Sequence, residues 1–256
     1  LCLYGTQSMA DEAGMSLEEY WEQIILACYL RDDDPIASWR KTRDEIETIK
    51  QKLNEMEIEK VHIEGEGIDL HVLIGKNRRW LGASGHNIPS FEIFTSPDWK
   101  GTNGTIAFNQ PLYYQGKKIS GITLLFKDGF VIRASATQNE EALLEMLSVE
   151  NADKVGEFSL TDARHSRIKK PMATTLFDEN MGGRYGNTHI AVGKSYKDAY
   201  TGDIANTTEQ EWAEMGFNDC PEVHTDIIST TDRKVTATLV TGEKVVIYKH
   251  GQFTIL

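Results

Sequence analysis

Residues 61–74 read VHIEGEGIDLHVLI, and this stretch decides the predicted fold. Ile68, Leu70 and Val72 alternate with polar residues, which is a period of two. Successive side chains of a strand point to opposite faces, so the pattern predicts a strand with one buried face and one solvent-facing face. The sequence before residue 61 has helical periodicity instead, and this change of period places a boundary near residue 60.

Two helices are predicted ahead of this boundary. Ser16-Leu-Glu-Glu19 is a capping box, and apolar residues at helical spacing follow it. Asp34-Pro35 offers an N-cap and a first-turn proline for the second helix. The apolar stripes of the two helices consist of Leu17, Tyr20, Trp21, Ile24, Ile25 and Cys28, and of Ile36, Trp39, Ile46, Ile49, Leu53 and Met56.

Strand patterns dominate the sequence after the boundary. A hairpin is predicted from residues 122–126 and 131–136, turning at Asp128-Gly129, and Asn139 caps a short helix. The sequence is strand-like again from Val235. We therefore predict an α+β protein, in which a helical pair precedes a mainly antiparallel, strongly curved sheet with helical insertions. Residues 1–60 are expected to pack as a helical segment on a second unit, residues 61–256.

The composition indicates a globular protein that does not bind nucleic acid. Hydrophobic residues make up 40% and charged residues 26% of the 256 residues. The net charge of −12 argues against a nucleic-acid partner, which requires a basic surface. One small basic cluster is either a solvated loop or a group that attracts the carboxylate of a peptide. It consists of Arg164, Arg167, Lys169 and Lys170.

The cysteines and the chain start bear on localisation. Cys2, Cys28 and Cys220 are an odd number without C-x-x-C spacing, which favours reduced thiols in a cytoplasmic protein. No apolar run approaches the roughly 18 residues that span a bilayer, so no membrane partner is expected. The chain begins with Leu1 rather than Met, and we expect a piece of a longer protein or a processed product.

Two short motifs contain candidate metal ligands. On a strand, His224 and Asp226 would point to the same face, because they are two residues apart. Glu92 lies among apolar residues between Pro89 and Pro97, and a carboxylate placed there needs a cation, a donor or a proton. Each motif has a structural alternative. The first could be a stabilising His–Asp pair, and Glu92 could pair with a core arginine or lysine.

Three further residues lie in sequence surroundings that are typical of metal or substrate sites. Glu157 lies between a glycine and an aromatic residue, and His189 follows the glycine-rich stretch 182–186. Glycines allow close backbone approach, as metal and substrate pockets often require. Tyr196 lies seven residues after His189, and its structural alternative is a half-buried aromatic ring with a satisfied hydroxyl.

Taken together, these motifs resemble one peptidase family. Asn87-x-Pro-x-x-Glu92-Ile-Phe-Thr-x-Pro97, Gly156-Glu157-Phe158, Gly182-Gly183…His189-Ile-Ala-Val-Gly193-x-x-Tyr196 and His224-x-Asp226 occur in the order found in the thermophilic dinuclear metalloaminopeptidases of the aminopeptidase T and aminopeptidase S type. The resemblance spans nearly the whole chain. It implies that two divalent ions, drawn from zinc, cobalt, manganese and magnesium, are held by Glu92, Glu157, His189, His224 and Asp226.

The resemblance also implies an activity. The expected reaction is removal of the N-terminal residue from peptides with a free N-terminus by a water that two metal ions activate. Glu157 or Asp226 would bridge the ions, with Glu157 counted among the catalytic residues, and Tyr196 would donate a hydrogen bond to the developing oxyanion. A homodimer is implied as well. Two alternatives stay open, which are a dinuclear hydrolase of another substrate such as a phosphoester, and an inactive or truncated relative that serves as a binding or assembly module.

This sequence departs from the family pattern in two places. Residues 184–188 lie between Gly183 and His189, where the family has fewer residues, and they make the direction of His189 less certain than that of His224. Family members also have a sizeable N-terminal domain ahead of the segment that matches Leu3, and we expect it to be missing here. Glu179 is expected in a surface acidic pair with its neighbour, with a place next to the metal ligands as the alternative, and His86 is the only other histidine close to a candidate ligand in sequence.

Overall fold

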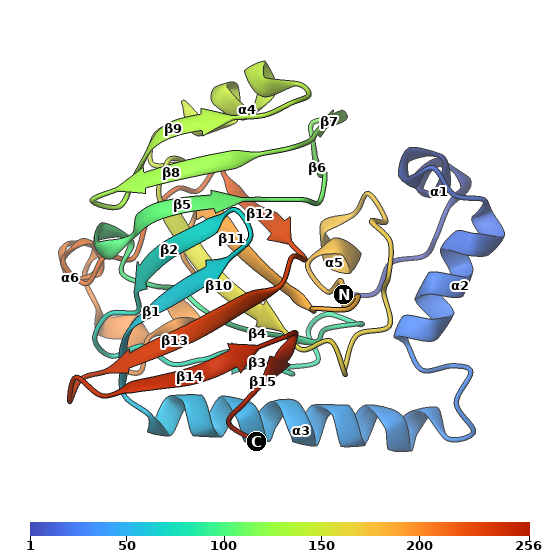
Figure 1. Ribbon diagram of the computed structural model, residues 1–256, viewed down its shortest axis with the longest axis horizontal. Coiled ribbons are helices and arrows are strands. Elements are labelled where there is room, and N and C mark those ends of the chain that lie inside the picture. Colours follow the sequence, from blue (N-terminus) through green and yellow to red (C-terminus); the bar gives the residue numbers. More distant parts are fainter.

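Two antiparallel sheets form the body of the molecule. The structure is a computed structural model that describes all residues 1–256 (Figure 1). The larger sheet has the strand order β15-β14-β13-β1-β2-β5-β8-β9. Its strands are β1 (Ile58–Gly65), β2 (Ile68–Leu73), β5 (Asn103–Ala107), β8 (Thr123–Lys127), β9 (Phe130–Ser135), β13 (Arg233–Leu239), β14 (Lys244–Lys249) and β15 (Gln252–Phe253).

The smaller sheet has five strands in the order β12-β11-β10-β4-β3. A separate hairpin pairs β6 (Leu112–Tyr114) with β7 (Lys117–Ile119). Both sheets are antiparallel throughout, so the predicted α+β class is confirmed. The five strands are β3 (Leu81–Gly82), β4 (Glu92–Thr95), β10 (Val155–Thr161), β11 (Asn187–Gly193) and β12 (His224–Ser229).

The sequence predicted one sheet, and the structure has two. The eight-stranded sheet contains all the alternating stretches, at residues 68–74 and 122–136 and after residue 235, and its outer face is exposed to solvent. In β10 and β11 every residue is buried, polar ones included. Strands buried on both faces do not alternate between apolar and exposed residues, so the second sheet has no period-two pattern.

The two sheets share one hydrophobic core. From the five-stranded sheet, Ile93, Phe158 and Ile190 contribute to it, and from the eight-stranded sheet Val61 and Leu70. Close packing of this kind fixes the position of both sheets. The prediction for the C-terminal strands is confirmed, with turns at residues 241–242 and 250–251.

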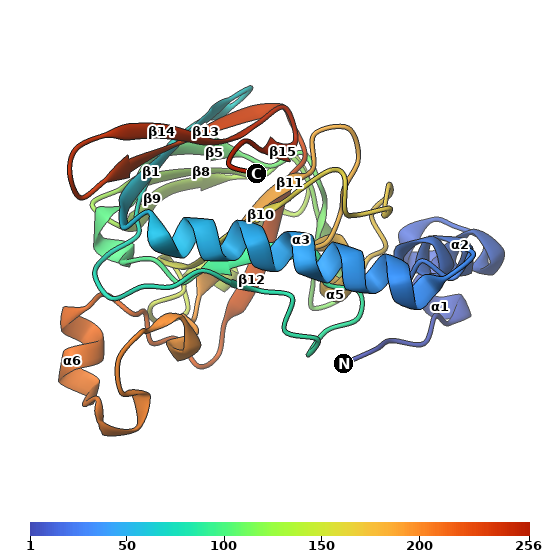
Figure 2. The same cartoon turned by 90° about the horizontal axis from the view of Figure 1, so that it is seen from below.

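The N-terminal region contains three helices. They are α1 (Gln7–Ala13), α2 (Leu17–Ala27) and α3 (Pro35–Glu55), and α3 runs along the side of the sheets in Figures 1 and 2. The last two match the predicted pair, including the capping box at Ser16 and the N-cap at Asp34. The first was missed because it is short and buries only Ala10.

These helices pack on different parts of the molecule. Ile46, Ile49 and Leu53 of α3 join the main core. By contrast, α1 and α2 form a separate cluster with residues from the segment 168–181, and the Tyr20 hydroxyl donates to the Met172 carbonyl at 3.0 Å. No helix has both the length and the apolar character needed to cross a bilayer. The remaining helices are α4 (Glu140–Leu147), α5 (Thr175–Asp178) and α6 (Glu209–Glu214), with short 3-10 turns η1 (Trp99–Gly101), η2 (Lys197–Ala199) and η3 (Ile204–Asn206).

Candidate metal centre

Strand register brings the predicted ligands onto one face of the five-stranded sheet. Glu157 on β10 lies opposite Ala191 on β11, and Ala191 lies opposite Asp226 on β12. Directly opposite residues share a face, so the two carboxylates are on the same side of the sheet. His224 is two residues before Asp226 and therefore joins this face.

The same rule places the other two predicted ligands. His189 lies opposite Ser159, which is two residues after Glu157 on β10. Glu92 lies opposite Thr161, two residues further along the same strand. All five side chains thus project from four neighbouring strands toward one side. The opposite face of these strands belongs to the main core, through Ile93, Phe158, Leu160, Ile190, Val192 and Ile227.

His189 lies at the centre of the cluster. Its Nε2 atom is 2.8 Å from Glu157 Oε1, 3.4 Å from Glu92 Oε2 and 3.9 Å from Asp226 Oδ1. The extra residues 184–188 do not redirect this side chain, because residues 187 and 188 already belong to β11 and extend its pairing with β10. In this structure the His189 side chain points to the carboxylates, as that of His224 does.

His224 approaches the carboxylates from the adjoining strand. Its Nε2 atom is 3.5 Å from Asp226 Oδ1 and 4.0 Å from Glu157 Oε2. On its other side, Nδ1 lies 2.7 Å from the Lys194 carbonyl oxygen. A carbonyl can only accept, so Nδ1 donates this hydrogen bond, and Nε2 is the nitrogen that remains for a metal ion. This is the arrangement of a histidine that ligates a metal through Nε2.

The carboxylates are buried in a cavity that no lysine or arginine lines. Glu92, Glu157 and Asp226 are each less than 9% exposed, and their only ion-pair partners are the two histidines. Burial, reinforced by the charge of Glu157, raises the pKa of Glu92. Burial and the charge of Asp226 likewise raise the pKa of Glu157. Negative charge gathered in this way is unstable unless protons or a metal neutralise it.

Three features fit a divalent metal. First, Oδ1 of Asp226 is buried and has no hydrogen-bond partner, so an acceptor inside the cluster is left unsatisfied. Second, Glu92, Glu157 and His189 each offer a ligand atom within 4.8 Å of the others. Third, a donor set of carboxylate oxygens and imidazole nitrogens suits zinc, cobalt or manganese. The residues present therefore have the chemistry that such an ion requires.

The cluster opens into a cavity of about 240 Å³ that contains no lysine or arginine in its lining. Tyr196 lines this cavity, and its ring centroid lies 4.6 Å from that of His224. Burial, together with the nearby carboxylates, raises the pKa of Tyr196, so the phenol keeps its proton and can donate a hydrogen bond. The complete lining is Leu81, Gly82, Ser84, His86, Asn87, Ser90, Glu92, Phe94, Glu157, Glu179, Tyr196, Asp198, His224 and Asp226.

The expected surface position of Glu179 is wrong, and the alternative position next to the candidate ligands agrees with the structure. Glu179 and its neighbour Asp178 are both buried, and Glu179 lines the cavity rather than the surface. Burial and the charge of Glu92 raise its pKa well above the ordinary value. The sequence does contain a signal for burial of this pair, because the apolar residues Leu176, Phe177 and Met181 lie close to it in sequence. Sequence reasoning also missed Asp198, whereas His86 does line the cavity.

The basic cluster of residues 164–170 does not line the cavity. Arg164 pairs with Asp162 at 2.6 Å, and Arg167 is held by hydrogen bonds to Asp32. Neither arginine lines the cavity, so no guanidinium group is available there for a phosphate.

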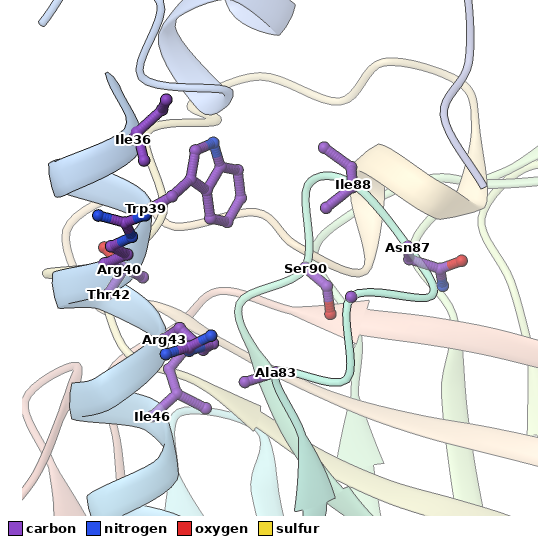
Figure 3. Close-up of a pocket in the computed structure, with 11 residues that line it drawn as sticks. Ile36, Trp39, Arg40, Thr42, Arg43, Ile46, Ala83, Asn87, Ile88 and Ser90 are labelled. Atoms are coloured by element: carbon purple, nitrogen blue, oxygen red, sulfur yellow. The ribbon is translucent and has the colours of Figure 1, made fainter. Parts of the chain in front are cut away.

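A second cavity, of about 270 Å³, lies next to the first but differs in character. It is formed between α3 and the loop of residues 83–90, and it shares Asn87 and Ser90 with the first cavity (Figure 3). Its lining includes Ile36, Trp39 and Ile46 and contains neither a carboxylate nor a histidine. A metal therefore has ligands only in the first of these two cavities.

The known proteins to which this chain is similar in sequence are named as aminopeptidases. The chain is 30% identical to Aminopeptidase PepS of Streptococcus thermophilus, over 96% of this chain and 60% of the relative. It is 31% identical to Aminopeptidase 2 of Geobacillus stearothermophilus, over 93% of this chain and 59% of the relative. The chain thus spans about three fifths of the length of these relatives.

Structural comparison agrees with the sequence. The fold is similar to that of wild-type AmpT from Thermus thermophilus, with a TM-score of 0.80 and 25% identity over 93% of this chain and 59% of that chain. Residues 1–253 match the family described as thermophilic metalloprotease (M29). The resemblance found in the sequence is therefore confirmed, and the chain belongs to the thermophilic metalloprotease (M29) family.

Proposed function

We propose that this chain holds two divalent metal ions through Glu92, Glu157, His189, His224 and Asp226, and that it serves in removing the N-terminal residue from peptides. The convergence of three buried carboxylates and two imidazoles without a lysine or arginine carries the proposal. The names of the relatives, which are aminopeptidases, supply the reaction class. The activity is a proposal for the protein as a whole, because this chain covers 60% of the length of Aminopeptidase PepS.

The chemistry that the ions supply is Lewis acidity, which makes hydroxide available near neutral pH. Glu157 would hold the metal together with both histidines, because its two oxygens face different imidazoles. Oε1 lies 2.8 Å from His189 Nε2, and Oε2 lies 4.0 Å from His224 Nε2. Asp226 differs from Glu157 in this respect, because one oxygen, Oδ1, faces both imidazoles.

Glu179 is proposed to accept and return the proton of the attacking water. Its carboxyl lines the same cavity and is buried without a cation, and its only side-chain hydrogen bond comes from Asn180 at 3.2 Å. Burial and the charge of Glu92 raise the pKa of this carboxyl, and a raised pKa suits a carboxyl to proton transfer.

Tyr196 is proposed to stabilise the oxyanion that forms on the scissile carbonyl. Its backbone N–H donates to Ser96 Oγ at 2.8 Å, which anchors the residue, while its side chain lines the cavity. A protonated phenol fixed beside the reacting carbonyl lowers the energy of the negative charge that develops there. The surplus negative charge of the cavity would attract the α-ammonium group of a peptide, which favours cleavage at the N-terminus.

Two further proposals concern organisation. Residues 61–256 would form the metal-binding unit, with residues 1–60 packed on it; the participation of α3 in the main core supports this packing. A homodimer is proposed from the family resemblance. Light scattering of the purified protein tests it, and a monomeric mass would reject it.

The function is tested by metal analysis and by hydrolysis of leucine p-nitroanilide, on protein purified without chelator and then supplied with zinc or cobalt. We expect bound metal, turnover of the anilide, and loss of both in Glu157→Gln. The control is Glu243→Gln, which changes an exposed glutamate in the turn between β13 and β14. Protein that binds no metal and stays inert would instead support a binding module, and turnover of p-nitrophenyl phosphate alone would support a phosphoesterase.

A further inference from the structure

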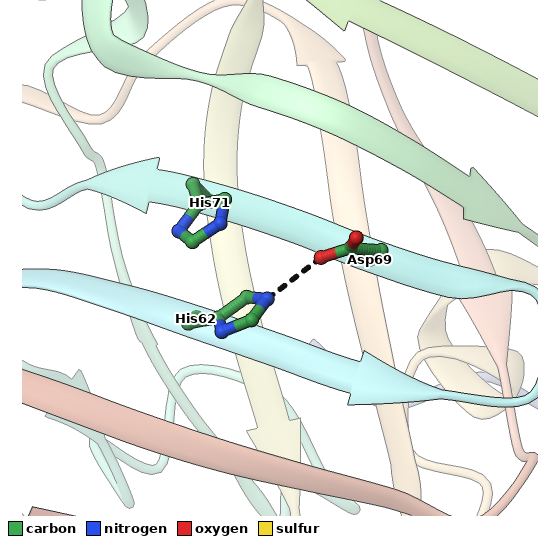
Figure 4. Close-up of side chains that lie close together, drawn as sticks. All are labelled: His62, Asp69 and His71. Atoms are coloured by element: carbon green, nitrogen blue, oxygen red, sulfur yellow. Dashed lines mark hydrogen bonds and ion pairs between the residues drawn. The ribbon is translucent and has the colours of Figure 1, made fainter.

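A second group of metal-ligand side chains lies on the outer face of the eight-stranded sheet. It consists of His62 on β1 and Asp69 and His71 on β2 (Figure 4). His62 lies directly opposite His71, and Glu64 lies opposite Asp69. Opposite residues and residues two apart share a face, so the four side chains project from the sheet on the same side.

The three ligand side chains lie within reach of one ion. The two imidazole rings are stacked, with centroids 3.9 Å apart and an interplanar angle of 11°. His62 Nε2 lies 2.7 Å from Asp69 Oδ1, and the candidate ligand atoms of the three residues are all within 4.8 Å of one another. Two donors on a tetrahedral zinc ion lie roughly 3.3 Å apart, given bond lengths of about 2.0–2.1 Å. The lone pairs of an imidazole lie in the plane of its ring, so the two stacked rings must turn out of their parallel arrangement before both can ligate one ion. The Asp69 side chain is 79% exposed and can rotate with them.

The backbone beneath this group is firmly held. β1 is paired with β13 on one side and β2 on the other, and β2 is paired with β1 and β5. The residues that alternate with the group, such as Val61, Leu70 and Val72, are fully buried in the main core. Ligands on such paired strands keep their spacing, whereas ligands on loops must be ordered when an ion binds.

We propose that His62, Asp69 and His71 form a second, solvent-accessible site for a borderline divalent transition metal such as copper, nickel or zinc. Two nitrogens and one oxygen favour these ions over magnesium or calcium, which prefer oxygen. The site differs from the buried centre, where three carboxylates accompany two histidines. It requires no contribution from that centre and no peptidase activity.

The competing interpretation is a pair of surface histidines held only by the carboxylate. Elsewhere on the surface, His250 Nδ1 lies 3.0 Å from Asp232 Oδ2 without a second imidazole beside it. That pair has one nitrogen ligand where the β1–β2 group has two, so it provides a matched control.

The test uses copper(II) as the probe on the full chain after the buried centre has been saturated with zinc. We expect wild-type protein to take up one further copper ion, with an electron paramagnetic resonance spectrum that shows coordinated imidazole nitrogen. The variants His71→Gln and His62→Gln/His71→Gln should bind this copper at least about tenfold more weakly, because ligands are lost. His250→Gln should behave as wild type.

Two outcomes would overturn the proposal. One is copper affinity and a spectrum unchanged in the double variant. The other is an equal loss of affinity in His250→Gln, which would show scattered surface binding. Far-ultraviolet circular dichroism of each variant verifies the fold. Should the double variant unfold, the Asp69→Asn variant, which changes an exposed side chain, makes the same comparison.

Discussion

His189 Nε2 lies 2.8 Å from Glu157 Oε1, although 32 positions separate the two residues in the chain. The contact joins neighbouring strands, β10 and β11, on the face of the sheet that carries the candidate ligands. Both side chains are almost completely buried. A metal ion and a proton therefore compete for the same atoms, and the first two predictions follow from this competition.

Replacement of Glu157 by glutamine should have opposite effects on the metal-free and metal-loaded protein. At a pH above the raised pKa of Glu157, the metal-free form should melt at a higher temperature than wild type, because a buried charge is removed. Zinc affinity should fall at least about tenfold, because one ligand is lost. Thermal scans with and without zinc measure both effects. A lower melting temperature in the metal-free variant would contradict this account of the cluster.

The stabilisation by metal should grow with pH. In the metal-free protein, burial and the charge of a neighbouring carboxylate raise the pKa values of Glu92 and Glu157, so the folded state binds more protons than the unfolded state above the ordinary glutamate range. Stability of the metal-free form is consequently lost as pH rises through the folded pKa values. The zinc-induced rise in melting temperature should be larger at about pH 8 than at about pH 5. An equal rise at both values would refute the prediction.

Tyr196→Phe should reduce kcat while leaving metal content unchanged. The substitution keeps the ring that packs against His224 and removes only the hydroxyl. Loss of one donor to an oxyanion costs about 10²–10³ in kcat, with a smaller effect on KM. Steady-state kinetics with leucine p-nitroanilide measure the change. Tyr200→Phe, in the separate aromatic cluster with Trp212, is the control and should keep wild-type kinetics.

Glu179→Gln should alter the pH dependence of kcat, because we assign proton transfer to this carboxyl. Its neighbour Asp178 provides a matched control, since that carboxylate accepts a hydrogen bond from the Thr174 N–H at 3.1 Å and supports the backbone. Asp178→Asn should lower the free energy of unfolding by about 1–3 kcal/mol and keep the wild-type pH profile. The assignment fails if the two variants have the same pH profile.

Gly193→Ala should weaken both the fold and metal binding. Gly193 has φ +96°, and a Cβ there would lie 2.1 Å from the Val223 carbonyl oxygen. Because Gly193 is paired with His224, the shift needed to relieve this contact would move a candidate ligand. A strained conformation of this kind costs about 1–3 kcal/mol. Urea unfolding and zinc titration measure the two effects. If the variant is destabilised but binds zinc as tightly as wild type, Gly193 does not position the candidate ligands.

Much of the fold could be predicted because its signals are local. The capping box at Ser16, the N-cap at Asp34 and the turn at Asp128-Gly129 depend on residues a few positions apart, and the structure has each of them. The family motifs likewise lie within short segments. They predicted a shared site for Glu92, Glu157, His189, His224 and Asp226, and the structure brings these five side chains together.

What the sequence by itself determined was therefore the class of structure, the positions of most helices and strands, and the identity of the candidate ligands. Only the tertiary structure decided that the strands form two sheets, that Glu179 is buried beside the cluster, and that His62 stacks on His71. The physical reason is that secondary structure responds to neighbours along the chain. Burial, pKa and ligand geometry respond instead to neighbours in space, and strand pairing between distant segments chooses those neighbours.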